Sequence, residues 1–248
     1  MVVMSAHRPI PDIIAVIRFA VAAAVIATGF GPPARAAEPV KRIGIYVQPY
    51  YEAARDPSGS PRVAVHKSLD VLLSSNERND IVSARDAVAA NTRTITPMTM
   101  MVLAIRLYDV GLRDQSVFWF YAAKDRYGAM TEVIDGAAAG LSEVDAAMKS
   151  FAVLAGPIVN GYAFCDLDNQ KKLRAEALAW VENNPYETMF LERIAGKPGD
   201  RHANLKRAIE DAKAAAAKER AYFDDPKSLA AFYEARTNNA MEAKYCWK

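Results

Sequence analysis

The chain has few of the residues from which metal centres and nucleophilic sites are built. It is 248 residues long and contains two cysteines, Cys165 and Cys246, and three histidines. The count and separation of the cysteines exclude a zinc cluster and a CxxC redox motif. His66 and His202 are far apart, and neither belongs to an HxxxH or HExxH arrangement. The sequence therefore predicts no metal site and no cofactor.

Recognisable catalytic motifs are also missing. No GxSxG sequence and no glycine-rich phosphate loop occurs. The stretch Asp166–Gln170 begins like a calcium loop, but Lys171 replaces the required glycine and Ala177 replaces the terminal glutamate. We therefore expect Asp168 to cap a helix, and we predict no catalytic residue. An active site built from carboxylates that are distant in sequence is left open.

Most of the chain lacks an excess of charge of one sign. Setting aside the three arginines and one aspartate of residues 1–36 leaves 28 basic and 28 acidic side chains. Proteins that bind nucleic acids or acidic lipid surfaces usually present a basic excess to the phosphate groups. The composition therefore argues against a nucleic-acid partner and against attachment to an acidic membrane surface.

The longest apolar run is short and lies near the N-terminus. Phe19–Phe30 spans 12 residues, whereas a membrane-spanning helix needs roughly 20. A basic leader, Met1–Arg18, precedes the run, and the helix-breaking Gly31–Pro33 follows it. Ala34-Arg35-Ala36 then has the small-x-small pattern of a cleavage site. This order predicts a secretory signal peptide at residues 1–36, cleavage before Ala37, and a periplasmic or secreted mature protein.

An uncleaved membrane anchor is the alternative interpretation of this segment. Extending the run back to Ile13 gives 18 residues, but the longer stretch includes the charge of Arg18. No cysteine follows the run closely, so a lipid-modified N-terminus lacks its acceptor residue. Because no second long apolar run occurs, we expect no stable membrane span after cleavage.

Both cysteines belong to the predicted mature part of the chain. In an oxidising compartment, a pair of cysteines is interpreted first as a disulfide. We therefore predict a bond between Cys165 and Cys246, which would tie the C-terminal end of the chain to its middle. Two unpaired thiols, or pairing with another chain, are the alternatives.

An extended arm and a loop, residues 37–65, are expected before the helices. Lys41–Gln48 alternates β-branched and small residues, and Arg55–Pro61 is rich in residues that form turns. The alternating pattern of Lys41–Gln48 is typical of a short strand or an extended arm. Because no good partner strand follows in the sequence, we expect it to lie on the helices.

Helical periodicity dominates residues 66–248, so we predict an all-α fold: an antiparallel helical bundle or an irregular array of helical hairpins. Ser142 and Asp145 approximate a capping box, and Gly156-Pro157 should kink or divide the helix that follows. Asp200 or Asn204 should begin a later helix. The longer predicted helices are 97–110, 115–134, 142–154, 169–183, 185–194, 226–245 and the one that runs from residue 200 or 204 to 223.

The stretch Thr96–Tyr127 has the pattern of a helical hairpin. Gly111 should end its first helix in a left-handed conformation, and Asp114 should cap the second. Small and large residues alternate along both helices: Leu103, Ala104, Leu107, Gly111, Ser116, Phe120 and Ala123. This unit, residues 96–127, resembles a tetratricopeptide or Sel1-type repeat, and the resemblance implies protein or peptide binding. No convincing second copy occurs, so an ordinary antiparallel helix pair is the alternative.

Aromatic residues provide the candidates for partner contacts. Four consecutive helical residues, Phe118–Tyr121, span about 300° of helix surface and cannot all face one core layer. Either this helix is buried on all sides, or Trp119 or Tyr121 faces outward and anchors a partner. The arm adds three tyrosines, a residue type that suits a partly exposed contact surface because the ring packs and the hydroxyl forms hydrogen bonds: Tyr46, Tyr50 and Tyr51.

These patterns favour an exported, non-catalytic module that binds a protein or peptide partner in the bacterial envelope, for example as an inhibitor or immunity factor. A cell-wall hydrolase on a helical scaffold and a structural subunit of an envelope assembly are the alternatives. A hydrolase should expose a cleft lined by a glutamate or aspartate with a raised pKa, whereas a binding module should not.

Overall fold

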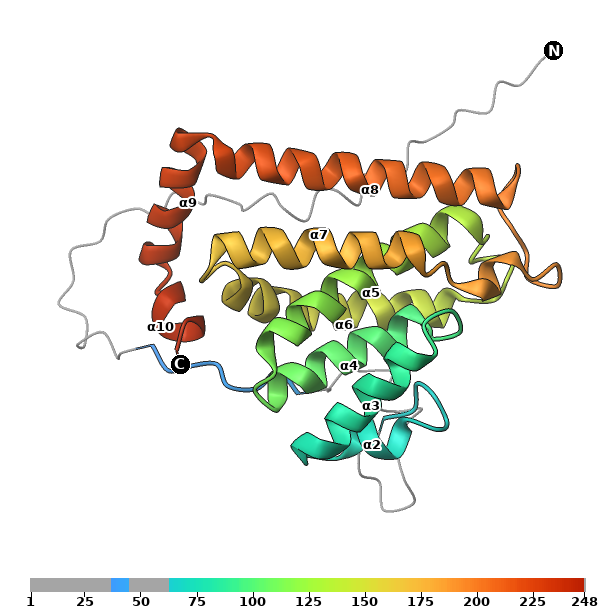
Figure 1. Cartoon of the computed structure of the whole chain (residues 1–248), viewed down its shortest axis with the longest axis horizontal. Coiled ribbons are helices and arrows are strands. Elements are labelled where there is room, and N and C mark those ends of the chain that lie inside the picture. The colour runs from blue at the N-terminus through green and yellow to red at the C-terminus, as the bar shows by residue number, and fades with distance from the viewer. Residues whose placement is uncertain (1–36, 45–62, 248) are drawn as a thin grey trace, which may run out of the picture. The chain divides into compact units, whose positions relative to one another are not determined.

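A computed structural model describes residues 37–44 and 63–247, and this part of the chain is all-α, as predicted (Figure 1). Its one β pairing is an isolated bridge between Ile134 and Gly196. None of its helices combines the length and apolarity that crossing a membrane requires. The elements are α2 (Asp70–Ser74), α3 (Arg78–Ala90), α4 (Pro97–Asp109), α5 (Arg113–Val133), α6 (Ser142–Ala163), α7 (Leu167–Asn183), the 3-10 helix η2 (Glu187–Phe190), α8 (Arg201–Asp224), α9 (Pro226–Asn238) and α10 (Met241–Tyr245).

Helices α4 and α5 form the centre of the fold. α4 begins as predicted, because the Thr96 hydroxyl accepts a hydrogen bond from the Thr99 amide at 3.0 Å and Pro97 occupies the first turn. Every residue from Thr99 to Tyr108 is buried, as its almost continuous apolar sequence requires. α5 packs against α4 on one side and against α7 and α8 on the other (Figure 1). The helix that carries four consecutive aromatic residues is therefore a central one.

The turn between α4 and α5 depends on Gly111. Its φ of +81° lies in the left-handed region, as predicted, and its amide donates to the Tyr108 carbonyl at 3.0 Å. The amide of Leu112 donates to the Leu107 carbonyl at 2.8 Å. These bonds satisfy carbonyls at the end of α4 that have no partner inside the helix.

Replacing Gly111 with Ala should lower the free energy of unfolding by about 1 kcal/mol, because the left-handed backbone is costly for a residue with a Cβ. No atom lies within 4 Å of the new Cβ, so a clash adds nothing. Gly128 is the matched control, since it lies inside α5 in equally open surroundings. There, Ala should stabilise the protein by about 0.5–1 kcal/mol because it favours the helix. Urea unfolding measures both changes, and effects of the same sign would contradict this explanation.

α6 continues through Gly156-Pro157, so of the two predicted effects, a kink or a division, the division is wrong. A proline at position 157 removes one backbone donor, whose partner in a regular helix is the carbonyl of residue 153. Val153 is 73% exposed, so this face of α6 is open to water that can bond the remaining carbonyl. The loss of one hydrogen bond is therefore tolerated in the middle of the helix.

Aspartate side chains cap three of the helices. Asp200 caps α8 and Asp225 caps α9, and each accepts a bond from the amide three residues later; Asp200 is one of the two residues predicted to begin its helix. Asp166 caps α7 by accepting from the Asn169 amide at 3.0 Å. The predicted cap at Asp168 is therefore wrong, because α7 begins two residues earlier than expected and places Asp168 in its first turn.

Two other predicted caps make tertiary contacts instead. Asp114 lies in the first turn of α5 and accepts a hydrogen bond from the Tyr162 hydroxyl at 2.8 Å. The expected capping box of Ser142 and Asp145 does not form, because Ser142 is already helical and Asp145 accepts from the Tyr127 hydroxyl. A carboxylate in a first turn still interacts favourably with the helix dipole without capping the helix.

The C-terminal region reverses direction instead of forming one helix from 226 to 245. α9 ends at Asn238, and Ala240 has a φ of +52°, in the left-handed region. α10 then turns back and packs against α6 (Figure 1). The helix predicted at 185–194 is likewise reduced to the 3-10 turn η2.

The described part of the N-terminal arm, residues 37–44, lies against the helices without forming a strand. The Val40 amide donates to the Lys244 carbonyl at 2.8 Å, and the Tyr108 hydroxyl donates to the Val40 carbonyl at 3.1 Å. The Ile43 amide donates to the Asp109 carboxylate at 2.6 Å. Of the two predicted forms, this part of the chain takes the extended arm; residues 45–48 lie outside the described residues.

A buried arginine joins two loops to the core. Arg126 is 1% exposed, and its guanidinium donates to the carbonyls of Thr92, Ile95 and Asn184 at 2.7, 2.9 and 2.5 Å. The guanidinium also lies 4.5 Å from the centre of the Trp180 ring. Burial lowers the pKa of Arg126 to about 10. The backbone of both loops is thus fixed by one side chain of α5.

Candidate functional site

A groove between α7 and α8 is the first candidate for ligand contact. The two helices run side by side across α5 (Figure 1), and the groove between them has a volume of about 210 Å³. Four alanines, from both helices, make up most of the apolar part of its lining. The apolar lining consists of Ala175, Leu178, Ala179, Ala216, Ala217 and Phe223.

Charged residues frame this apolar lining. Four are basic and two are acidic: Lys171, Arg174, Lys213, Arg220, Glu182 and Glu219. Glu219 accepts a hydrogen bond from the Gln170 side chain at 2.8 Å, and Glu182 accepts from Lys213 at 2.6 Å. Both carboxylates of the groove therefore already have a donor.

A buried ion pair lies at the junction of α5 and α7. Arg174 donates two hydrogen bonds to the Asp125 carboxylate. Burial raises the pKa of Asp125 above its ordinary value, although the neighbouring Arg174 opposes the shift. Asp125 does not line the groove, so its carboxyl group is not presented to a ligand there.

A second hollow, of about 300 Å³, lies where α3, α5 and α7 meet. Arg85 and Gln115 both line it, and the Arg85 guanidinium donates to the Gln115 side chain at 2.8 Å. Phe118 and Trp119 also line it, and the Trp119 ring packs against Trp180 with centroids 5.2 Å apart. Its aromatic lining belongs to the packing of α5 on α7 rather than to a free surface.

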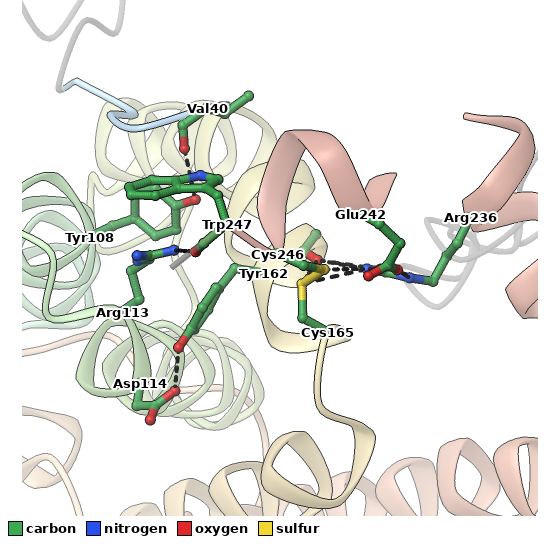
Figure 2. Close-up of a disulfide and its surroundings, with 11 residues drawn as sticks. Val40, Tyr108, Arg113, Asp114, Tyr162, Cys165, Arg236, Glu242, Cys246 and Trp247 are labelled. Atoms are coloured by element: carbon green, nitrogen blue, oxygen red, sulfur yellow. Dashed lines mark hydrogen bonds and ion pairs between the residues drawn. A yellow bond between two sulfur atoms is a disulfide. The ribbon is translucent and has the colours of Figure 1, made fainter. Parts of the chain in front are cut away.

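The predicted Cys165–Cys246 disulfide forms the third candidate (Figure 2). The two Cα atoms are 5.5 Å apart, and the bond joins the segment after α6 to the residue after α10. Beside it, the Arg113 guanidinium lies 3.8 Å from the centre of the Trp247 ring and donates to the Trp247 carbonyl at 2.9 Å. The C-terminal segment is therefore held by contacts other than the covalent bond.

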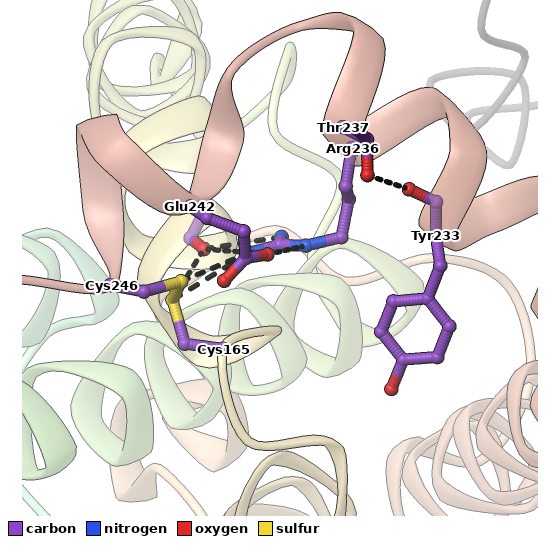
Figure 3. A network of polar contacts seen from close by, with 7 residues as sticks. Cys165, Tyr233, Arg236, Thr237, Glu242 and Cys246 are labelled. Carbon is purple, nitrogen blue, oxygen red and sulfur yellow. Dashed lines mark hydrogen bonds and ion pairs between the residues drawn. A yellow bond between two sulfur atoms is a disulfide. The ribbon is translucent and has the colours of Figure 1, made fainter. Parts of the chain in front are cut away.

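Arg236 lies directly against the disulfide, and its guanidinium contacts both the sulfur atoms and Glu242 (Figure 3). Its Nη2 atom is 3.3 Å from the Cys246 sulfur and 3.6 Å from the Cys165 sulfur. The guanidinium also pairs with the Glu242 carboxylate at 2.8 Å and donates to the Gly161 carbonyl at 3.3 Å. Arg236 is only 4% exposed, so solvent screens these contacts little.

The two sulfur atoms and a Glu242 oxygen lie within 4.8 Å of one another, close enough to be considered as ligands for a metal ion. Thiolate ligands are available only when the disulfide is reduced. Arg236 also holds a positive charge against both sulfur atoms, so a cation would have to displace a group of its own sign. The donor set therefore fits a metal ion poorly.

A protein of Haemophilus influenzae is 35% identical to this chain over 210 residues. The similarity covers 85% of this chain and 81% of the relative, which is described as an uncharacterized protein. The chain belongs to the family of this Haemophilus protein. No protein-family model matches the chain, and no solved structure matches it.

Two of the predicted contact residues of this family member are buried. Trp119 is 5% exposed and Tyr121 is 6% exposed, so neither ring faces outward to anchor a partner. The Tyr121 hydroxyl instead donates to the Asn160 side chain at 3.1 Å and accepts from Gln170. Burial raises the Tyr121 pKa. The other three candidates lie outside the described residues: Tyr46, Tyr50 and Tyr51.

Sequence reasoning missed the α7–α8 groove and the cation at the disulfide. Alanines at Ala175, Ala179 and Ala216 indicate a close helix contact as readily as an open groove, and only the separation of α7 and α8 distinguishes the two. Arg236 lies ten residues before Cys246, but nothing in that spacing predicts the reversal at Ala240 that brings them together.

Proposed function

We propose that the protein is exported to the bacterial envelope and binds a protein or peptide partner without catalysing a reaction. The observation that carries this proposal is the α7–α8 groove, whose apolar walls are small and whose two carboxylates already have donors. Small side chains on both walls allow the backbone of a partner helix to approach closely. A helix laid in a groove is a common mode of peptide recognition. The resemblance of residues 96–127 to a tetratricopeptide or Sel1-type repeat supports the same class of function.

The charges around the groove indicate the chemistry of the partner. Among its lining residues, four basic side chains accompany two acidic ones. Glu182 and Glu219 accept hydrogen bonds from residues that line the groove. Arg220 forms no hydrogen bond or ion pair with the residues that the structure describes. A partner segment that presents alanine or leucine to the walls and an acidic residue to Arg220 fits this arrangement.

The same geometry argues against a cell-wall hydrolase. Hydrolysis of a glycosidic bond usually requires two carboxyl groups that face the substrate. Glu182 and Glu219 line the groove but accept bonds from Lys213 and Gln170. Asp125 has a raised pKa, but it lies outside the groove lining, paired with Arg174. Hydrolysis would require these carboxylates to leave their present partners and face a substrate, whereas binding a partner in the groove would not.

Export is supported by two independent features. The order of basic leader, apolar run and small-residue site in residues 1–36 is that of a cleaved secretory signal. A disulfide between Cys165 and Cys246 persists in an oxidising compartment and is rare in the cytosol. An uncleaved anchor would give the same compartment and a different N-terminus.

N-terminal sequencing of the protein recovered from the cell envelope should give Ala37 as the first residue. The reason is the small-x-small site Ala34–Ala36 directly before it. Replacing Ala36 with a bulky residue such as Trp should block the cleavage and retain the longer chain, whereas Arg35→Lys should not. A membrane-bound protein that starts at Met1 or Met4 would contradict the prediction.

Replacing Ala217 with Glu should abolish partner capture while leaving the fold intact. The side chain enters the groove, where it fills space and places a negative charge against an acidic partner, and Glu is a good helix former at an exposed position. Ala214 is the matched control, because it is exposed on the same helix but does not line the groove.

The measurement is affinity capture from an envelope extract with the wild-type protein, Ala217→Glu and Ala214→Glu, compared by mass spectrometry. We expect a protein that is captured by the wild type and the Ala214 variant and lost from the Ala217 variant by at least tenfold. Equal circular dichroism spectra establish that both variants fold. Capture that is unchanged by Ala217→Glu would remove the groove from the proposal.

A further inference from the structure

We propose that Cys165 and Cys246 form a reversible thiol–disulfide exchange site, with Arg236 stabilising the thiolates that form when an external dithiol reduces the bond. The inference does not depend on the proposed partner-binding function, because it uses a different region of the molecule. It concerns the bond drawn in Figures 2 and 3.

The first argument is the charge next to the sulfur atoms. The Arg236 guanidinium lies 3.3 Å from one sulfur and 3.6 Å from the other, and it is almost fully buried. A disulfide is neutral, so this cation contributes little to the oxidised state. A thiolate is negative, and a neighbouring arginine stabilises it over the protonated thiol. The arrangement therefore favours the reduced state relative to a disulfide without a cation.

The second argument is that reduction would leave the two sulfur atoms close together. The Val40 amide binds the Lys244 carbonyl, and Arg113 binds the Trp247 carbonyl and packs on its ring. These contacts hold the residues on both sides of Cys246 without the covalent bond. The C-terminal segment can therefore stay in place when the bond is broken, and the bond can form again.

The third argument is access. Cys165 and Cys246 are both half-buried, so neither sulfur is sealed inside the core. Cys246 lies directly after the last turn of α10. A dithiol can approach a bond at this position more easily than one in the core formed by α4 and α5.

The exchange is a two-electron reaction. One thiolate of the dithiol attacks a sulfur of the Cys165–Cys246 bond, which breaks, and the other cysteine leaves as a thiolate beside Arg236. The second thiol of the dithiol, as its thiolate, then attacks the mixed disulfide and releases the second cysteine. The dithiol leaves as its own disulfide, and its two protons go to the cysteine thiolates or to the solvent. A protein dithiol of the envelope is the class of reductant that this site would meet.

Two substitutions with opposite expected effects test the inference. Arg236→Gln removes the cation and, at a pH above the pKa of the thiols, should shift the equilibrium with dithiothreitol about tenfold toward the disulfide, the size of one pKa unit at a neighbouring thiol. Glu242→Gln removes the carboxylate that partly neutralises Arg236 and should shift the equilibrium about threefold toward the dithiol. This effect is smaller because the Glu242 side chain is 57% exposed, and water screens an exposed charge.

The experiment uses the oxidised mature protein and both variants in a series of reduced and oxidised dithiothreitol mixtures. The reduced fraction is measured by alkylation and mass spectrometry, and circular dichroism checks the fold. A merely structural role of Arg236 predicts that both variants loosen the segment and become easier to reduce. Shifts of the same sign, or no shift in the Glu242 variant, would overturn the proposal.

Discussion

Replacing Arg126 with Met should lower the free energy of unfolding by about 3 kcal/mol. The guanidinium donates to three backbone carbonyls in two loops and is 1% exposed, so its removal leaves these groups without a donor inside the protein. A buried polar group that loses its partner costs about 1–3 kcal/mol. Met fills much of the volume, and the apolar contact with Trp180 recovers part of the loss.

Arg126→Lys should recover little of this stability. An ammonium group is a compact charge, whereas the planar guanidinium reaches carbonyls of Thr92, Ile95 and Asn184 at the same time. Arg93→Gln is the control, since it removes an arginine that is exposed and paired only at the surface, with Glu187. We expect it to cost less than 1 kcal/mol. Urea unfolding measures all three variants. A Met variant as stable as the wild type would show that burying the cation costs as much free energy as its hydrogen bonds contribute.

Replacing both cysteines with Ser should lower the free energy of unfolding by about 4 kcal/mol. The bond joins residues that are 81 positions apart, and closing a loop of this length removes much of the conformational freedom of the unfolded chain. Cys165 and Cys246 must be changed together, because a single change leaves one thiol that can pair with another chain. The comparison is urea unfolding of the oxidised wild type and the double variant.

The reduced and alkylated wild type provides a second measure of the same effect. It should unfold at nearly the urea concentration of the double Ser variant, since both lack the cross-link. A difference from the oxidised wild type of less than about 1 kcal/mol would contradict this explanation, because it would mean that the cross-link removes little conformational freedom from the unfolded chain.

Features that depend on local backbone chemistry were predictable from the sequence. Thr96 and Pro97 at the start of α4, and Gly111 at its end, act through bonds within a few residues of themselves. The disulfide was predictable because the chain has only two cysteines, which leave a single intramolecular pairing in the oxidising compartment that the sequence predicts. The all-α class followed from the long stretches of helical periodicity, which a few errors at helix ends do not change.

Features that depend on the tertiary arrangement were not predictable in the same way. Asp114 and Asp145 have the residue type of caps, but tyrosines from other helices bind them, and no local rule reveals such partners. The reversal at Ala240 occurs at a residue that rarely adopts a positive φ. Trp119 has the residue type of a contact anchor, and only its position between packed helices shows that it is core.

The arginines that bind backbone carbonyls have a consequence for how this family can diverge. Arg126 holds carbonyls of residues 92, 95 and 184, and Arg201 holds those of residues 189, 191 and 194. Every residue type offers the same carbonyl group, so these loops are recognised by the position of their main chain and not by their side chains. Relatives can therefore exchange loop residues freely, while an insertion or deletion would move the carbonyls out of reach. We expect loop length, rather than loop sequence, to be inherited together with these arginines.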